Sequence, residues 1–166
     1  MTYSASYPIP HSMRNTIECC TAGLGVIGPI GGALGPGTDL PVIIPTWVGM
    51  VCTLAEQAGH QMDKHTAKKV AMATATGAMS MVAGTKVAST VLGWLLSIPS
   101  GGASLLASMA ANSAINAKFT HAYGKACALY FLQSDGPDST DVVVAVLLAL
   151  IGLEFGIPSS RKDVSP

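Results

Sequence analysis

The sequence predicts an all-α protein in which small-residue-rich helical hairpins form a compact bundle. Its apolar segments are rich in Ala, Met and Leu at helical spacing and lack the period-two alternation of strands. Short stretches rich in Gly, Pro and charged residues separate these segments. Only 11% of the residues are charged, against roughly 25% in ordinary soluble domains. Because so little of the surface is suited to water, we expect the bundle to be membrane-associated and oligomeric.

The charged residues are also unevenly distributed along the chain. Four runs contain none of them: residues 19–38, 40–55, 70–85 and 87–117. Such a composition arises when the missing charged surface faces lipid or other copies of the same protein. Nine basic residues balance nine acidic ones, and there are only three Phe, four Tyr and two Trp, so we expect no nucleic-acid partner.

In the amino-terminal region we expect an extension over residues 1–15, without a secretory signal, and a first helix over residues 17–34. In an exposed helix, each glycine of this segment costs about 1 kcal/mol relative to Ala, and Pro29 costs about 3 kcal/mol. Close packing against another element has to compensate for these costs, or the segment is a loop.

A second helix is predicted over residues 40–58. Asp39 is placed to cap its amino terminus, and Pro41 falls in the first turn, where its missing N–H costs nothing. Pro45 lies further into the segment, so we expect a break near residue 44.

The third and fourth helices, over residues 64–97 and 102–132, form a predicted hairpin that turns at Ser97–Gly102, around Pro99. The third carries a face of small residues for helix packing and self-association, comprising Gly77, Ser80, Gly84 and Ala88. The fourth carries a hydrogen-bonding stripe with fourfold spacing, comprising Ser104, Ser108, Asn112, Asn116 and Thr120. Such spacing is equally typical of a tight alanine-rich bundle, and both interpretations predict helix contacts.

Both segments of this hairpin are long enough to span a bilayer. Lys86, however, lies close to the middle of the third segment, and a charge near the bilayer centre is costly. Two alternatives to a simple span therefore remain: the hairpin is enclosed in a protein assembly, or it lies partly in the bilayer. These helices belong to a predicted helical-hairpin domain over residues 16–133.

Residues 134–157 are predicted to form an acidic turn and a final apolar helix over 140–155, followed by a polar tail over 158–166. The run from Val142 to Leu153 is apolar on every face, which predicts burial. At twelve residues it is too short for a standard membrane span of about 20.

No motif for catalysis, a cofactor or a metal ion is present at the required spacing. The string Ala83–Ser89 lacks the Gly-Lys pair of a phosphate loop, because Thr85 interrupts it. His60, Asp63 and His65 have poor spacing for metal binding and are better explained by a solvated turn and a helix cap. We expect a non-enzyme with no cofactor, no metal site, and reduced, buried cysteines.

Six short motifs occur in a characteristic order along the chain. They are PGTDLP at Pro36–Pro41, MVCTLAEQAG at Met50–Gly59, DKHTAKK at Asp63–Lys69, AG at Ala83–Gly84, IPSGG at Ile98–Gly102 and YF at Tyr130–Phe131. In this order they resemble the YcjF-type uncharacterised helical domain, over about residues 24–132. In bacteria that domain is often attached to, or encoded near, Era-like GTPases and is described as membrane-associated. The resemblance implies a helical-hairpin fold, a location at the bacterial inner membrane and a separate GTPase as partner, since this chain carries no GTPase motif; it implies no catalytic residue.

The leading functional hypothesis is a non-enzymatic, self-associating helical membrane protein with a structural or membrane-organising role. The alternative is a soluble, cytoplasmic homo-oligomeric scaffold or shell subunit, because copies of the chain can cover one another's apolar surfaces. A third hypothesis is a binder of lipid or of a small apolar ligand, in which methionines line a pocket. The candidate pocket residues are Met62, Met72, Met79, Met81 and Met109.

Overall fold

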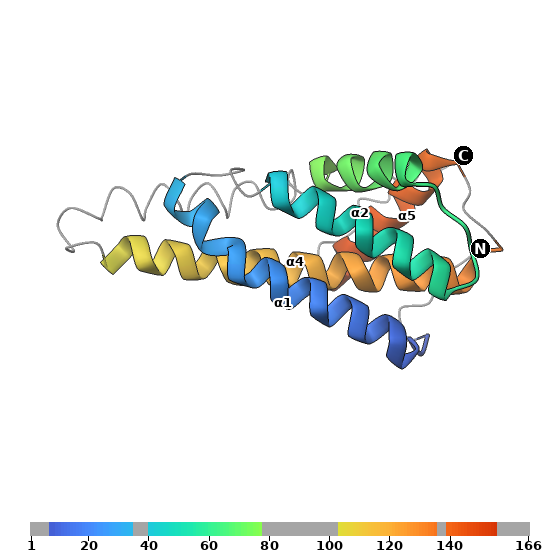
Figure 1. Ribbon diagram of the computed structural model, residues 1–166, viewed down its shortest axis with the longest axis horizontal. Coiled ribbons are helices and arrows are strands. Elements are labelled where there is room, and N and C mark those ends of the chain that lie inside the picture. Colours follow the sequence, from blue (N-terminus) through green and yellow to red (C-terminus); the bar gives the residue numbers. More distant parts are fainter. Residues whose placement is uncertain (1–6, 35–39, 78–102, 136–138, 156–166) are drawn as a thin grey trace, which may run out of the picture.

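The computed structural model describes residues 7–34, 40–77, 103–135 and 139–155, with the backbone alone at 28–34, 40 and 103–105. The described part of the chain is helical and contains no strand, as the sequence predicts. Its elements are α1 (His11–Leu34), α2 (Leu40–Gln57), a helical segment over residues 64–77, α4 (Ala103–Gln133) and α5 (Thr140–Glu154) (Figure 1).

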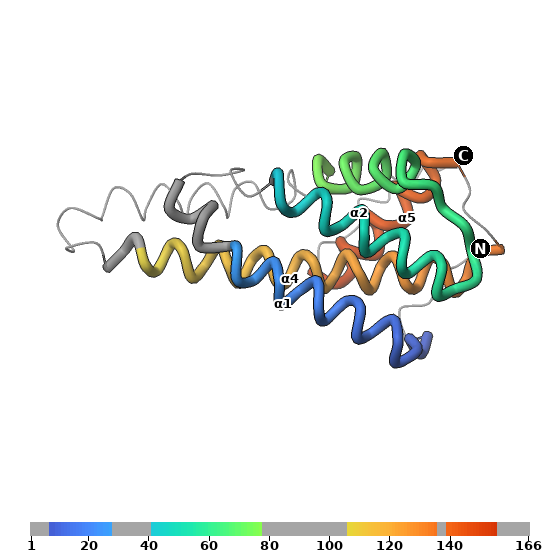
Figure 2. The backbone as a smooth tube through the Cα atoms, in the orientation of Figure 1, coloured from blue at the N-terminus to red at the C-terminus, as the bar shows by residue number. Residues whose placement is uncertain are grey.

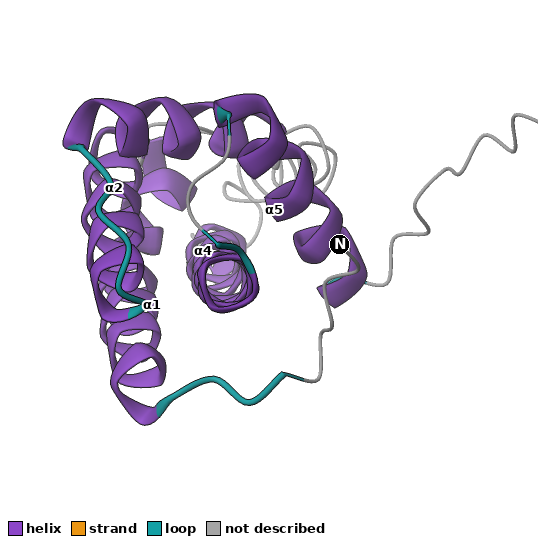
Figure 3. Cartoon of the chain, turned by 90° about the vertical axis from the view of Figure 1, so that its right-hand side faces the viewer, coloured by secondary structure: helices purple, strands orange, loops and turns teal. Residues whose placement is uncertain are grey.

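The central element is α4, which the other helices surround. Seen along the bundle, α4 lies in the middle, with α1 and α2 on one side and α5 on the other (Figure 3). The backbone trace shows α1 running obliquely across α4 (Figure 2), and among α1, α2, α4 and α5 the pair α1–α4 has the most extensive contact. Between Ala122 and Phe131, every residue of α4 except Lys125 is buried. This half of α4 therefore forms the centre of the hydrophobic core.

Helix α1 begins earlier than predicted. The sequence assigned residues 1–15 to an extension, but α1 starts at His11, and its first turn closes with the Arg14 N–H donating to the Pro10 carbonyl at 3.1 Å. The reason is an apolar stripe that already begins at Met13 and continues through Ile17 and Leu24, all of them at most 1% exposed. Burial of Met13 against the core extends the helix by a turn and a half beyond the expected start.

Helix α2 is continuous through Pro45, so the predicted break near residue 44 is wrong. The ring of Pro45 removes one hydrogen bond, to the carbonyl of Pro41, which lies in the first turn of the helix. This cost is offset by a stripe of buried apolar residues at helical spacing along α2. Burial of each large side chain stabilises the folded state by roughly 1.5–3 kcal/mol. The members of this stripe are Ile43, Trp47, Met50, Val51 and Leu54.

The turn after α2 requires a glycine. Gly59 has a φ of +85°, in the left-handed region. The His60 N–H donates to the Ala55 carbonyl at 2.9 Å, and the Gly59 N–H donates to the Glu56 carbonyl at 2.9 Å. This pair of bonds is a Schellman motif, which satisfies the last carbonyls of α2 and turns the chain toward residues 64–77.

Asp63 caps the helical segment over residues 64–77, which agrees with the turn-and-cap interpretation of this region. Its Oδ1 accepts the backbone N–H groups of His65 at 2.9 Å and Thr66 at 3.0 Å, and its Oδ2 accepts the Thr66 hydroxyl at 2.6 Å. The hydrogen bonds from Thr66, more than the remaining contacts, lower the pKa of Asp63.

We expect Asp63→Ala to lower the melting temperature at neutral pH, because the N–H groups of His65 and Thr66 lose their acceptor. Since the folded pKa of Asp63 is depressed, its stabilisation is present above the unfolded value of about 3.9 and is lost as the pH falls through the folded value. Thermal unfolding of both proteins from pH 7 to pH 2 measures this effect, with Asp63→Asn as the conservative control. A difference in melting temperature that persists unchanged at the lowest pH contradicts the prediction.

Helix α5 lies near its predicted bounds, but only one of its faces is buried. Val143, Leu147, Leu150 and Ile151 pack into the core, whereas Val142 and Leu153 are 44% and 60% exposed. The residue after the helix, Phe155, stacks on Phe119 of α4 with ring centroids 4.5 Å apart. The uniformly apolar composition of α5 thus leaves an apolar face uncovered by the described part of the chain.

Candidate functional site

The hydrogen-bonding stripe predicted from the sequence lies on the side of α4 that faces the bundle interior. Ser108, Asn112, Asn116 and Thr120 are each at most 3% exposed. Ser104 precedes them in α4, at a position where only the backbone is described. The fourfold spacing therefore places polar side chains, which ordinarily face water, inside the protein.

The opposite side of this half of α4 is exposed and apolar. Leu106 is 67% exposed, and Ala107, Ala110 and Ala114 are exposed as well. We call these four residues the outer α4 face. A soluble bundle helix ordinarily buries its apolar side and exposes its polar side, so the arrangement over residues 106–116 is inverted. An inverted helix is typical of a protein whose surface is covered by lipid or by another protein.

Contacts with α1 and α2 hold the buried side of α4 in place. The Ser113 hydroxyl donates to the Gly25 carbonyl of α1, and a Cβ on Gly25 would lie 3.7 Å from the Cβ of Ala117. From α2, the Trp47 indole N–H donates to the Thr120 hydroxyl at 3.1 Å. The Ser108 hydroxyl is buried and has no hydrogen-bond partner among the described residues.

Beyond Thr120, toward the carboxyl terminus of α4, the core contains aromatic side chains and a cysteine. Trp47 stacks on Tyr123 with ring centroids 4.2 Å apart. Burial raises the pKa of Tyr123 well above its ordinary value and raises the pKa of the Cys127 thiol to about 12. Both groups are therefore neutral at physiological pH, and they contribute packing and not an ionised nucleophile.

The four cysteines are free thiols, but they are not all buried as expected. Cys127 is buried, Cys20 and Cys52 are half-buried, and Cys19 is exposed. Cys19 lies on the side of α1 that points away from α4, because the buried stripe of α1 runs through Ile17 and Leu24. The apolar surroundings of a cysteine in the sequence do not identify which side of its helix it occupies.

Two close contacts between helices occur at glycines, Gly77 and Gly124. Of these two, the sequence identified Gly77 as a packing residue. A Cβ on Gly77 would lie 2.8 Å from Cδ1 and Cδ2 of Leu148, at the flexible end of a side chain on α5. A Cβ on Gly124 would lie 2.8 and 2.9 Å from Cγ1 and Cγ2 of Ile17 and 3.1 Å from the Met50 sulfur. Gly124, a lone glycine inside an otherwise regular helical pattern, was missed; such a glycine is itself a packing signal.

Several sequence-predicted residues lie outside the described part of the chain. Of the proposed packing face, Gly77 is described, whereas Ser80, Gly84 and Ala88 are not. The cap Asp39 and the turn residue Pro99 also lie outside it, as does Lys86, whereas Pro41 is the second residue of α2 and is exposed. Of the candidate pocket methionines, Met79 and Met81 lie outside it, Met62 and Met109 are half-buried, and Met72 is exposed.

The charged residues of α1, α2, α4 and residues 64–77 gather at one end of the bundle. Helices α1 and 64–77 run in one direction, and α2 and α4 run in the other. The starts of α1 and of 64–77 therefore lie at the same end as the carboxyl termini of α2 and α4 (Figure 1). The charges of these four elements lie in the half of each helix nearer that end, with Lys118 at the midpoint of α4: Arg14, Glu18, Glu56, Lys64, Lys68, Lys69, Lys118 and Lys125. We call the opposite end, from which the charge-free residues 19–34, 40–55, 70–77 and 103–117 extend, the uncharged end.

Large apolar side chains are exposed at the uncharged end. Val26 of α1 is 79% exposed, and Val42, Met72 and Leu106 are also exposed. The bundle is thus amphipathic along its long axis as well as across α4. In no helix of the described residues does an apolar stretch reach the length and hydropathy that a membrane span requires.

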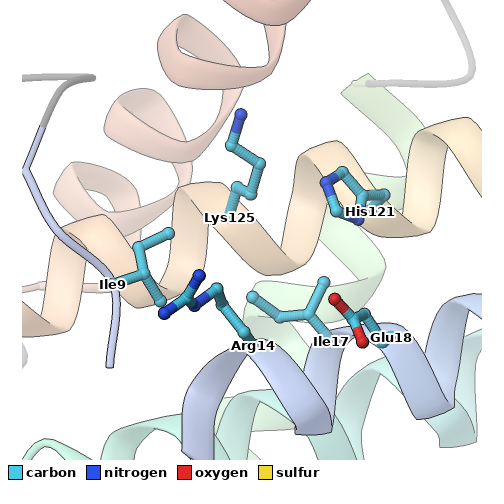
Figure 4. A pocket seen from close by; sticks show the side chains of 6 residues that line it. All are labelled: Ile9, Arg14, Ile17, Glu18, His121 and Lys125. Carbon is cyan, nitrogen blue, oxygen red and sulfur yellow. The ribbon is translucent and has the colours of Figure 1, made fainter. Parts of the chain in front are cut away.

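A small pocket lies in the charged half, between α1, α4 and the residues just before α1 (Figure 4). Its volume is about 140 Å³. Isoleucine side chains and the aliphatic parts of charged ones line it. The lining residues are Ile9, Arg14, Ile17, Glu18, His121 and Lys125.

His60 does not belong to a metal site in the described structure. Its Nε2 lies 2.8 Å from the Phe131 carbonyl, near the end of α4, and a neutral or charged ring can donate this bond from Nε2. The bond ties the turn after α2 to the carboxyl terminus of α4. Within the described ranges, no group of three or more His, Cys, Asp or Glu side chains is arranged to hold a metal ion.

No family model, curated protein or solved structure matches this chain. The resemblance to the YcjF-type domain stays a prediction.

Proposed function

We propose that this chain is a non-enzymatic, self-associating helical protein with a structural role at a membrane. The observation that carries the proposal is the inverted half of α4, where Ser108, Asn112 and Asn116 are buried while Leu106, Ala110 and Ala114 are exposed. Exposed apolar side chains on a folded surface are stabilised when lipid or another apolar surface replaces water around them.

The segregation of charge supports an orientation for this association. The uncharged end exposes Val26, Val42, Met72 and Leu106, and we propose that this end contacts the membrane. The charged end then remains in water, where its lysines and carboxylates keep their hydration. A separate GTPase, implied by the resemblance, is a candidate partner for this end.

The size of the exposed residues favours a second candidate, a soluble homo-oligomeric scaffold. Three of the four residues of the outer α4 face are alanines, and α1, which packs on α4, exposes Ala22 and Gly23. Small side chains let a second helix approach closely but add little apolar volume for insertion into lipid. In this alternative, the same face contacts another copy and not lipid.

Fractionation of cells that express the untagged protein distinguishes the two candidates. The membrane pellet is extracted first with carbonate and then with detergent, and the dissolved material is sized. Extraction by detergent alone, as an oligomer, supports the membrane role. A large soluble particle overturns it in favour of the scaffold, and a soluble monomer contradicts both.

A charge on the outer α4 face tests whether this face makes the association. We expect Ala110→Glu to convert the oligomer or membrane-bound form largely to soluble monomer, because a carboxylate at this position would have to be desolvated in an apolar contact. Analytical ultracentrifugation and the same fractionation measure the change. The matched control is Asn15→Glu, at an exposed helical position of the charged end. Equal behaviour of the two variants contradicts the assignment of this face.

A further inference from the structure

The pocket between α1 and α4 combines an apolar floor with a charged rim. Ile17, which is 1% exposed, forms part of the floor, and the half-buried Ile9 lies against the pocket from the segment before α1. Arg14, Glu18, His121 and Lys125 surround these side chains (Figure 4). Three separate parts of the chain therefore form the pocket: the segment before α1, α1 itself and the middle of α4.

The cations of the rim are not equivalent. The Lys125 ammonium lies 3.0 Å from the Glu154 carboxylate of α5, and its side chain points away from Arg14 in Figure 4. Arg14 makes no ion pair with any residue that the structure describes, and its guanidinium lies beside Ile9 (Figure 4). Glu18 and His121 lie on the other side of the pocket, on α1 and α4 (Figure 4). The cation available to a ligand is thus Arg14.

We propose that this pocket binds a small amphiphilic monoanion, a carboxylate attached to an apolar group of about six carbon atoms. The carboxylate pairs with the Arg14 guanidinium, which presents two parallel N–H groups to such an anion. The apolar group packs on Ile9 and Ile17. This site is independent of the face that we propose for self-association.

The size and the charge of the pocket select this class of ligand. A volume of about 140 Å³ in this partly open pocket leaves room for a group the size of benzene, which an enclosed apolar cavity of about 150 Å³ holds. A phosphate ion has no apolar part to occupy the floor. Its second negative charge would also be repelled by Glu18, while Lys125 is already paired with Glu154.

Titration of the full chain with benzoate tests the proposal, followed by NMR chemical shifts and by calorimetry. We expect a Kd on the order of 1 mM, typical of a ligand of this size. Benzamide has nearly the same shape without the charge, and inorganic phosphate has the charge without the apolar ring. We expect both to bind at least about tenfold more weakly than benzoate, because each makes only one of the two contacts.

Two variants assign the contacts. Arg14→Gln is expected to weaken benzoate binding at least about tenfold and to leave benzamide binding unchanged, whereas Ile9→Ala weakens both ligands. Lys68→Gln, which removes a cation from an exposed helical position elsewhere, is the matched control and leaves both unchanged. Melting curves establish that each variant is folded. The proposal is overturned if benzoate binds Arg14→Gln as well as it binds the natural chain, if benzamide binds as tightly as benzoate, or if benzoate at about 50 mM does not bind.

Discussion

Replacing Trp47 with alanine is expected to lower the free energy of unfolding by about 3–5 kcal/mol. The indole is 4% exposed, stacks on Tyr123, and donates its N–H to the Thr120 hydroxyl at 3.1 Å. The substitution leaves a large cavity between α2 and α4 and removes the donor from a buried hydroxyl. Because typical domains are stable by only about 5–15 kcal/mol, the loss is large enough to leave a substantial unfolded population. Urea unfolding followed by circular dichroism measures it.

Two further substitutions separate ring packing from the hydrogen bond. Trp47→Phe keeps an aromatic ring over Tyr123 but removes the N–H, so we expect a smaller loss than for alanine. Thr120→Val removes the acceptor. In a double-mutant cycle of Trp47→Phe and Thr120→Val, the coupling energy should be about 0.5–1.5 kcal/mol, the net value of one hydrogen bond. A loss below about 1 kcal/mol for Trp47→Ala would contradict the position of the ring in the core.

Gly124→Val is expected to lower the free energy of unfolding by at least about 2 kcal/mol, and Gly124→Ala by about 1–2 kcal/mol. The first side-chain carbon at this position would lie 2.8 and 2.9 Å from two carbons of Ile17. A β-branched residue in a helix has one strongly preferred χ1 rotamer, so Ile17 cannot rotate away and α1 has to move. This strain outweighs the gain of about 1 kcal/mol in helix propensity that alanine brings.

Glycines elsewhere in the bundle provide the matched control. Gly23 and Gly49 lie in helices, and a Cβ on either would meet nothing within 4 Å. We expect Gly23→Ala and Gly49→Ala to raise the stability by about 0.5–1 kcal/mol, the opposite sign to Gly124→Ala. Ile17→Ala should also become less damaging in the presence of Gly124→Ala, because the new methyl group fills part of the cavity. Stabilisation by Gly124→Ala would refute the close contact.

Local signals predicted the helical elements well and their ends less well. Pro45 predicts a break when it is considered alone, but the buried stripe from Ile43 to Leu54 keeps α2 continuous. The start of α1 depends on Met13, whose burial requires the core that α4 and α2 provide. In both places, tertiary packing outweighed a local preference of a few kcal/mol.

The packing residues show the same division. Spacing identified Ser108, Asn112 and Asn116 as one side of a helix, and it also identified Gly77 as a small residue on a helix face. It did not distinguish Gly124, which contacts Ile17, from Gly23, which has open space around it. The difference depends on which residue of a distant helix lies opposite, and this is not encoded in the local sequence.

By itself, the sequence determined that the chain is helical, which of its residues share a helix face, and that its charges lie outside long apolar runs. These properties follow from 3.6 residues per turn and from composition, and both are local. Only the tertiary structure decided that the polar side of α4 points inward while its alanines point outward. It also decided that charges distant in sequence gather toward one end of the bundle. It brought Arg14 and His121 together beside one pocket. A helix can turn either face toward its neighbours, and packing among segments up to a hundred residues apart selects one.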